Sequence, residues 1–240
     1  MSKRTLTILH LYPKDMNIYG DYGNVLVLKR RAEWHGYEVK VIDYNPGDDF
    51  PEKFDILVGG GGQDSGQDRV QSDLQKIGPK LKTMANKGVP MLVVCGLYQL
   101  FGKFFQTQTG RVIKGVSILD IETFAESERL IGNIVTKSHE FGEIIGYENH
   151  SGKTYIGNIA NLGKVIKGAG NNGKIDKTEG ARYKNVIGTY MHGSLLPKNP
   201  KIADWMISKA ATNKYGTFDK AKIDDGIAKL AREHASKRPR

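Results

Sequence analysis

The chain has 240 residues, of which 39% are hydrophobic and 26% charged, with a formal net charge of +10 at pH 7. These values are ordinary for a globular protein with a substantial core. The single cysteine, Cys95, excludes an intrachain disulfide and a metal site built from several cysteines. The longest apolar run, residues 89–94, is too short to span a bilayer, and the N-terminus lacks signal-peptide features. We therefore expect a cytoplasmic protein with a reduced thiol.

The positive charge is concentrated towards the C-terminus, where residues 201–240 contain ten Lys or Arg and five Asp or Glu. Nucleic acid and an anionic membrane surface both attract basic proteins. No interleaved aromatic residues or zinc-finger spacing accompany these charges, so we expect no nucleic-acid partner and at most weak association with an anionic membrane surface. Residues 236–240 are expected to form a frayed tail.

Strands and helices alternate in the first part of the chain. Apolar runs predict strands at residues 5–11, 37–44, 54–58 and 90–94. Helical spacing predicts helices at residues 25–35, 70–86 and 97–105. Because this alternation is typical of parallel sheets covered by helices on both faces, we expect an α/β fold.

The second part of the chain is richer in predicted strands. Short β-rich runs occupy residues 115–123, 130–137, 142–148, 164–168 and 185–190. They predict an antiparallel or mixed extension, followed by helices at residues 200–211 and 220–233. No repeat or low-complexity linker divides the chain, so we expect a single domain over residues 1–240, with C-terminal helices and a basic tail from about residue 197.

Cys95 stands between a predicted strand and a predicted helix, and Gly96 follows it. A nucleophile on such a turn projects above the edge of the sheet. The start of a helix also favours a thiolate over a thiol. A buried cysteine that only fills space is the alternative at this point.

A run of four glycines, residues 59–62, follows another predicted strand and lies at the same sheet edge as Cys95. The backbone amides of Gly61, Gly62 and Gly96 are candidates for an oxyanion hole, with Gln63 and Asp64 in support. A flexible loop is the alternative reading. The run is not a phosphate loop, because no Gly-Lys-Ser/Thr follows it.

A general base is expected among the six histidines. His192 follows the predicted strand at 185–190, which places it at the end of a strand. His150, in the polar cluster after the predicted strand at 142–148, is its rival and otherwise a supporting residue.

Together these segments resemble class I glutamine amidotransferases, most closely the cobyric acid synthase-like branch. Within that branch, the chain is similar to glutaminase subunits that work with a Mur-ligase-like protein, MurT. The segments that carry the resemblance are residues 17–24, 60–64, 95–99, 128–133, 146–152 and 190–193.

The resemblance implies a flavodoxin-like class I glutamine amidotransferase fold, with a mostly parallel central sheet, helices on both faces and a β-rich extension. It implies that Cys95 attacks the carboxamide of glutamine and that His192 transfers protons. Gln99 and Arg129 would hold the substrate, with Arg129 at its α-carboxylate. No cofactor or metal is expected in this chain, and ATP and Mg²⁺ are expected in the partner ligase.

One position departs from many class I amidotransferases, which have a glutamate two residues after the histidine. Here that position is Ser194, so His192 lacks a carboxylate nearby in the sequence to fix its tautomer. We therefore expect the partner ligase to supply the acid.

The resemblance thus implies the glutaminase subunit of a heterodimer. It would hydrolyse L-glutamine and supply ammonia to MurT, which amidates the D-glutamate α-carboxyl of the lipid II stem peptide in peptidoglycan biosynthesis. The alternatives are a glutaminase for another acceptor, as in cobyrinate amidation, a stand-alone cysteine hydrolase of similar fold, or a basic binding module.

Overall fold

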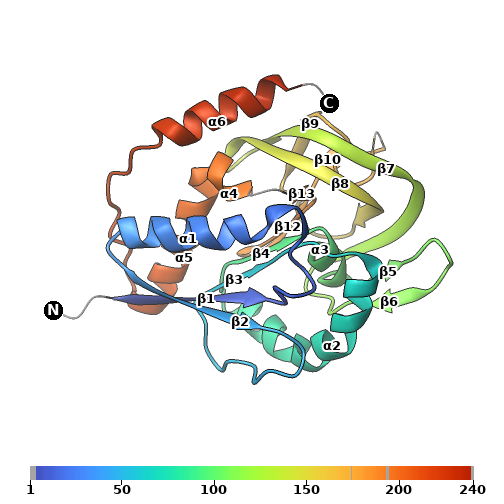
Figure 1. Cartoon of the computed structure of the whole chain (residues 1–240), viewed down its shortest axis with the longest axis horizontal. Helices are drawn as coiled ribbons and strands as arrows, with labels where there is room; N and C mark the ends of the chain where they lie inside the picture. Colours follow the sequence, from blue (N-terminus) through green and yellow to red (C-terminus); the bar gives the residue numbers. More distant parts are fainter. Residues whose placement is uncertain (1–3, 174, 193–194, 239–240) are drawn as a thin grey trace.

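A six-stranded sheet forms the centre of the computed structural model, which describes residues 4–173, 175–192 and 195–238. The strand order is β11-β12-β4-β3-β1-β2 (Figure 1). All neighbours are parallel except β11, which pairs antiparallel with β12. The strands are β1 (Thr5–Leu11), β2 (Glu38–Tyr44), β3 (Ile56–Gly59), β4 (Met91–Val94), β11 (Ala181–Tyr183) and β12 (Val186–Thr189).

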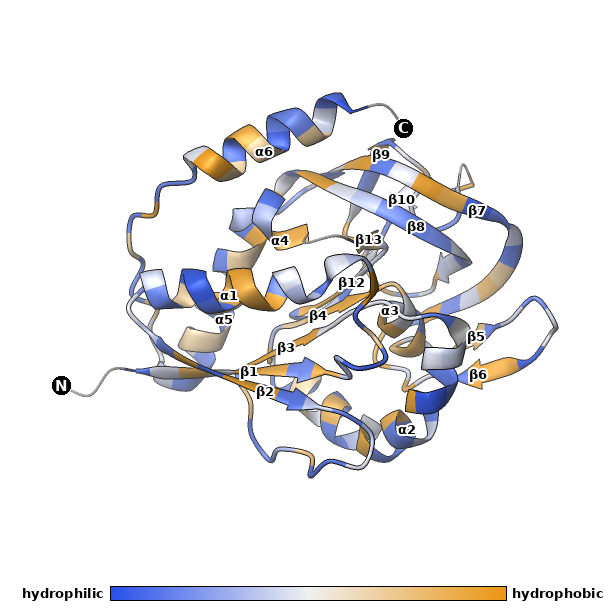
Figure 2. Ribbon diagram, in the orientation of Figure 1, coloured by the Kyte–Doolittle hydropathy of each residue, from blue (hydrophilic) through white to orange (hydrophobic). Residues whose placement is uncertain are grey.

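Helices cover both faces of this sheet, as predicted. α1 (Tyr22–Trp34) and α5 (Pro200–Tyr215) pack together on one face, and α2 (Asp64–Asn86) lies on the other (Figure 1). The central strands β3 and β4 are continuously apolar, which Figure 2 shows as orange ribbon. Every residue of β3, β4 and β12 is buried, because both faces of the sheet are covered.

A second, seven-stranded sheet confirms the predicted β-rich extension. Its central strand, β7, pairs antiparallel with β8 along one edge. Along the other edge it pairs parallel with β5 near its start and antiparallel with β9 near its end. The strands are β5 (Phe104–Gln106), β6 (Val112–Lys114), β7 (Ile121–Ser138), β8 (Gly142–Ile156), β9 (Gly163–Lys167), β10 (Thr178–Glu179) and β13 (Met191–His192).

The helix predicted at residues 97–105 is much shorter in the structure. α3 (Gly96–Leu100) ends before Gly102, at which a Cβ atom would lie 2.5 Å from the side chain of Ile121. The amide of Lys103 then donates to the carbonyl of Ile121, so the chain leaves the helix and joins the second sheet as β5. Tertiary pairing has overridden the local helical spacing.

Other boundaries also differ from the prediction. The runs at 130–137 and at the end of 115–123 belong to the one long strand β7. α1 and α2 begin earlier than predicted, because their first turns are polar and carry little apolar periodicity. α6 (Gly226–Lys237) begins later than predicted, and Ser236 and Lys237 are helical rather than part of a frayed tail.

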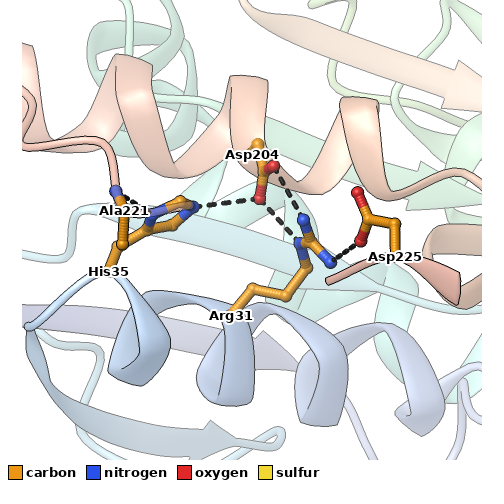
Figure 3. Close-up of polar contacts among 5 residues, drawn as sticks. All are labelled: Arg31, His35, Asp204, Ala221 and Asp225. Carbon is orange, nitrogen blue, oxygen red and sulfur yellow. Dashed lines mark hydrogen bonds and ion pairs between the residues drawn. The ribbon is translucent and has the colours of Figure 1, made fainter. Parts of the chain in front are cut away.

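The segment that leads into α6 is fixed by a cluster of polar contacts (Figure 3). Arg31 of α1 makes two hydrogen bonds to Asp204 of α5, at 2.6 and 2.8 Å, and one to Asp225 at 2.7 Å. His35 lies 3.1 Å from Asp204 through Nε2, and its Nδ1 accepts the amide of Ala221 at 3.1 Å. These contacts bind the connector to both helices, away from the sheet edge described next.

None of the helices within the described ranges is long and apolar enough to cross a membrane.

Candidate active site

The carboxyl ends of four parallel strands meet at one edge of the central sheet. The register pairs Leu11 with Gly59, Gly59 with Val93, and Val94 with Thr189. The turn after β1, the glycine run, Cys95 and the segment after β12 therefore emerge together. In open α/β sheets this edge is the usual position of a ligand site.

Cys95 has the strained backbone of a nucleophile on a tight turn. Its φ is 49° and its ψ is −105°, a conformation that costs a non-glycine residue about 1–3 kcal/mol. Two hydrogen bonds of 2.9 Å hold it, from its amide to Thr189 and from the amide of Gln99 to its carbonyl. Because α3 is little more than one turn long, its dipole contributes less to a thiolate than the sequence suggested.

His192 lies where the chain passes from one sheet to the other. It follows β12 of the central sheet and pairs with Tyr147 of β8 in the second sheet. A Cβ atom on Gly61 would lie 2.5 Å from Cε1 of His192 and 3.1 Å from Cβ of Cys95. The glycine run therefore passes directly beside both side chains, and only glycine fits there.

Asp21 supplies a carboxylate to His192 from within this chain. Its Oδ2 lies 3.3 Å from Nδ1 of the imidazole and accepts the amide of Gly61 at 2.7 Å. The carboxylate is buried, and a side chain on Gly60 would collide with it. The expectation that the acid comes from the partner chain is thus not required by this geometry, because Asp21 occupies the orienting position. Ser194 lies outside the described residues.

The charges around His192 favour its protonated form. Burial lowers the pKa of His192, but the electrostatic interaction with Cys95 and the hydrogen bond and charge of Asp21 more than offset this, so that the pKa rises to about 10. No described residue hydrogen-bonds Nε2 of this imidazole. At neutral pH the site therefore holds an imidazolium beside the cysteine.

The three predicted oxyanion-hole residues differ in what their amides can do. The amide of Gly61 is already hydrogen-bonded to Asp21. The amide nitrogen of Gly62 lies 3.1 Å from the position of a Cβ atom on Gly96, and no acceptor for it occurs among the described residues. The amides of Gly62 and Gly96 thus remain available side by side.

A cavity of about 570 Å³ opens over Cys95, within the size range of small-molecule sites. Its wall includes several of the residues that the sequence singled out, namely Gly62, Gln63, Cys95, Gln99, Arg129 and His150. Gln63 is exposed at its rim. Asp64 begins α2, and its side chain is not among those that the structure describes. No cluster of three or more potential metal ligands occurs in the part of the chain that the structure describes.

Gln99 is hydrogen-bonded at both ends of its amide. Its Oε1 accepts Nε2 of Gln67 at 2.6 Å, and its Nε2 donates to the hydroxyl of Tyr190 at 3.1 Å. Burial raises the pKa of Tyr190, so its hydroxyl stays protonated. The amide of Gln99 therefore shapes the cavity wall within an internal network.

Arg129 lies at the cavity beside an irregularity in the β7–β8 ladder, between Ala125 and Leu130. Its Nε donates to Asn149 at 2.7 Å, and its Nη2 donates to the hydroxyl of Tyr19 at 3.2 Å. Both partners are neutral, and no carboxylate among the described residues pairs with this guanidinium. Its charge is thus available to an anionic ligand.

His150 is buried in the same wall, with its ring stacked on Tyr190 at 3.5 Å. Burial, together with the charges of His192 and Arg129, lowers its pKa to about 3. Its Nδ1 is hydrogen-bonded to the carbonyl of Gly152 at 2.8 Å. Such an imidazole is a weak base, which favours His192 in that role.

Comparisons with known proteins agree with this geometry. Residues 7–200 match the family model described as "CobB/CobQ-like glutamine amidotransferase domain". The chain is 41% identical over 221 residues to the Staphylococcus aureus (strain N315) protein named "Lipid II isoglutaminyl synthase (glutamine-hydrolyzing) subunit GatD", covering 92% of this chain and 90% of that one. It is 37% identical over 215 residues to the protein of the same name from Streptococcus pneumoniae (strain ATCC BAA-255 / R6), covering 88% and 82%.

The fold is also that of a solved glutamine amidotransferase from Thermotoga maritima. The TM-score is 0.54 at 13% identity, over 96% of this chain and 93% of the other. This similarity confirms the predicted fold class.

Proposed function

This chain belongs to the family of CobB/CobQ-like glutamine amidotransferase domains, and we propose that it hydrolyses L-glutamine at Cys95 and passes the ammonia to a separate ligase subunit. The observation that carries the proposal is the contact series from buried Asp21 through buried His192 to Cys95, which lines the cavity. The cavity also contains an unneutralised arginine, as an amino-acid substrate requires.

In the first half of the reaction, the thiolate of Cys95 attacks the side-chain carbonyl carbon of glutamine. The oxygen becomes negatively charged and is stabilised by the amides of Gly62 and Gly96. His192 gives its proton to the amide nitrogen, the carbon–nitrogen bond breaks, and ammonia leaves. The product on the enzyme is a γ-glutamyl thioester.

In the second half, His192 removes a proton from water, which attacks the thioester carbon. The carbon–sulfur bond then breaks, glutamate leaves, and the Cys95 thiolate forms again beside the protonated imidazole. Asp21 stabilises the imidazolium and keeps Nδ1 protonated throughout.

Arg129→Ala is expected to raise KM for glutamine roughly ten- to hundredfold, because a guanidinium–carboxylate hydrogen bond contributes about 1.5–3 kcal/mol. Alkylation of Cys95 by a small neutral reagent should keep its wild-type rate. The matched control is Arg111→Ala, since Arg111 lines the same cavity but is already paired with Asp68 at 2.7 Å. An unchanged KM in Arg129→Ala would show that Arg129 does not bind glutamine.

The acceptor of the ammonia is proposed from the relatives. Both GatD proteins are named as subunits of lipid II isoglutaminyl synthase, and this chain spans most of their length. We propose a Mur-ligase-like partner, MurT, which uses ATP and Mg²⁺ to activate the D-glutamate α-carboxyl of lipid II. This work would take place in the cytoplasm, where the single thiol stays reduced. The net charge of +10 would favour weak contact with an anionic membrane surface.

The proposal is tested by measuring ammonia and glutamate from L-glutamine, with the chain alone and with the ligase. The complete mixture with ATP, Mg²⁺ and lipid II should yield D-isoglutamine in the stem peptide. A stand-alone cysteine hydrolase would release no ammonia from glutamine in either mixture. A cobyrinate-type amidase would release ammonia but leave lipid II unchanged.

A further inference from the structure

Tyr19 occupies an unusual position at the rim of the active-site cavity. It lies in the short 3₁₀ turn η1 (Ile18–Gly20) with φ 58°, in the left-handed region that disfavours a side chain. Strain of this kind persists only where the surroundings hold the residue in place. The turn is tied to the glycine run by a 3.1 Å hydrogen bond from the amide of Ile18 to the carbonyl of Gly61.

The hydroxyl of Tyr19 has a proton to donate. It accepts Nη2 of Arg129 at 3.2 Å, which uses one of its lone pairs and leaves its own O–H free. No acceptor for that proton occurs among the described residues. Tyr19 lines the cavity, and the residue is 45% exposed, so a ligand can reach the hydroxyl. A guanidinium N–H and a phenolic O–H thus lie side by side at the cavity rim.

The ring of Tyr19 also contacts the catalytic imidazole. The two ring centroids are 5.0 Å apart with an interplanar angle of 71°, an edge-to-face arrangement. Gly61 and Asp21 lie against the same imidazole, at Cε1 and Nδ1. Tyr19 is therefore the one described aromatic residue that contacts both the catalytic histidine and Arg129.

We infer that Tyr19 completes the substrate site: its hydroxyl donates to the α-carboxylate of glutamine beside Arg129, and its ring holds His192 in position. This inference rests on the proposed glutaminase function and adds a specificity residue to it. A carboxylate has two oxygens and accepts two donors at once, so the adjacent N–H and O–H match it. Because Tyr19 and Asp21 share one turn, substrate contact and base orientation depend on the same segment.

The test compares two substrates and two variants in the full chain, with the partner subunit present if the chain alone is inactive. The second substrate is 4-aminobutanamide, which keeps the carboxamide and amino group of glutamine but has hydrogen in place of the α-carboxylate. Tyr19→Phe removes only the hydroxyl, and Tyr19→Leu removes the ring as well. Tyr22→Phe is the matched control, because Tyr22 lies on the next turn and does not line the cavity.

Tyr19→Phe is expected to reduce the preference in kcat/KM for glutamine over 4-aminobutanamide about tenfold, through KM and with kcat little changed. Tyr19→Leu should show the same loss of preference together with a lower kcat on both substrates. Tyr22→Phe should resemble the wild type.

Two results would overturn the inference. An unchanged substrate preference in Tyr19→Phe would exclude the hydroxyl, and an equal kcat in Tyr19→Leu and Tyr19→Phe would exclude the positioning role of the ring. Failure of the wild type to release ammonia from glutamine would instead overturn the proposed function. The wild-type measurement therefore distinguishes failure of the inference about Tyr19 from failure of the proposed function.

Discussion

Cys95→Ser is expected to abolish ammonia release from glutamine while the protein stays folded. Loss of a catalytic nucleophile lowers kcat by about 10⁴- to 10⁶-fold in enzymes of this kind. A serine hydroxyl is far less acidic than a thiol. Beside His192 and Asp21 it therefore stays protonated and is a poor nucleophile towards the carboxamide. The measurement is glutamate formation under saturating glutamine, with thermal unfolding followed in parallel.

Cys95→Ser replaces the sulfur atom and changes little else. Serine is nearly isosteric and inherits the same φ of 49°, so no new backbone strain is introduced. Since the chain has one cysteine, alkylation with a small reagent should label the wild type once and Cys95→Ser not at all. Glutamate formation at the wild-type rate in the folded variant would rule out Cys95 as the nucleophile.

The arrangement of the catalytic elements follows from information that is local in the sequence. Apolar runs ending in Gly59, Cys95 and the segment before His192 predict parallel strands, and parallel strands bring their carboxyl ends to one edge. The register confirms this edge, with Gly59 opposite Val93 and Val94 opposite Thr189. The sequence is therefore sufficient to bring the glycine run, the cysteine and the histidine together.

The sequence does not single out Asp21, although the meeting of parallel strands at their carboxyl ends applies to it as well. It follows β1, which neighbours β3, and so belongs to the same edge. Nine residues separate it from the end of that strand, and the path of the turn depends on contacts such as the bond from Ile18 to Gly61. Those contacts are tertiary, so spacing alone does not reveal that Asp21 points at His192. The β5 strand was missed for the same reason, since its partner in the sheet is the distant β7.

Asp21→Asn is expected to lower kcat by about 10²- to 10⁴-fold, as when an orienting aspartate is replaced in other triads. Oδ2 of Asp21 makes both contacts, to the amide of Gly61 and to Nδ1 of His192. An asparagine oxygen in that position can still accept both donors, but it carries no negative charge to stabilise the imidazolium. An asparagine that places its NH₂ group there instead would direct N–H groups at the amide N–H of Gly61 and at a protonated Nδ1.

The pH profile gives this prediction a second readout. In the wild type, His192 keeps its proton up to a pKa of about 10, raised in part by Asp21, so kcat/KM should fall only at alkaline pH. Without the carboxylate the pKa of His192 is lower, and the alkaline limb must move to lower pH. The control is Asp43→Asn, at an exposed aspartate that lies 3.1 Å from His10 and does not line the cavity.

The same variant decides where the orienting acid resides. If Asp21 is that acid, Asp21→Asn should lose activity equally with and without the ligase, because the contact lies entirely within this chain. If the ligase contributes the carboxylate, its addition should restore Asp21→Asn, and replacing an interface Asp or Glu of the ligase should remove that gain. The 3.3 Å separation of Asp21 and His192 is longer than most charge-assisted hydrogen bonds, which are about 2.7–2.9 Å. A ligase that shortened this contact would raise kcat in the wild type and leave Asp21→Asn unchanged. Measuring kcat of the wild type and of Asp21→Asn, each with and without the ligase, therefore distinguishes an acid within this chain, an acid from the ligase, and a ligase that shortens the contact between Asp21 and His192.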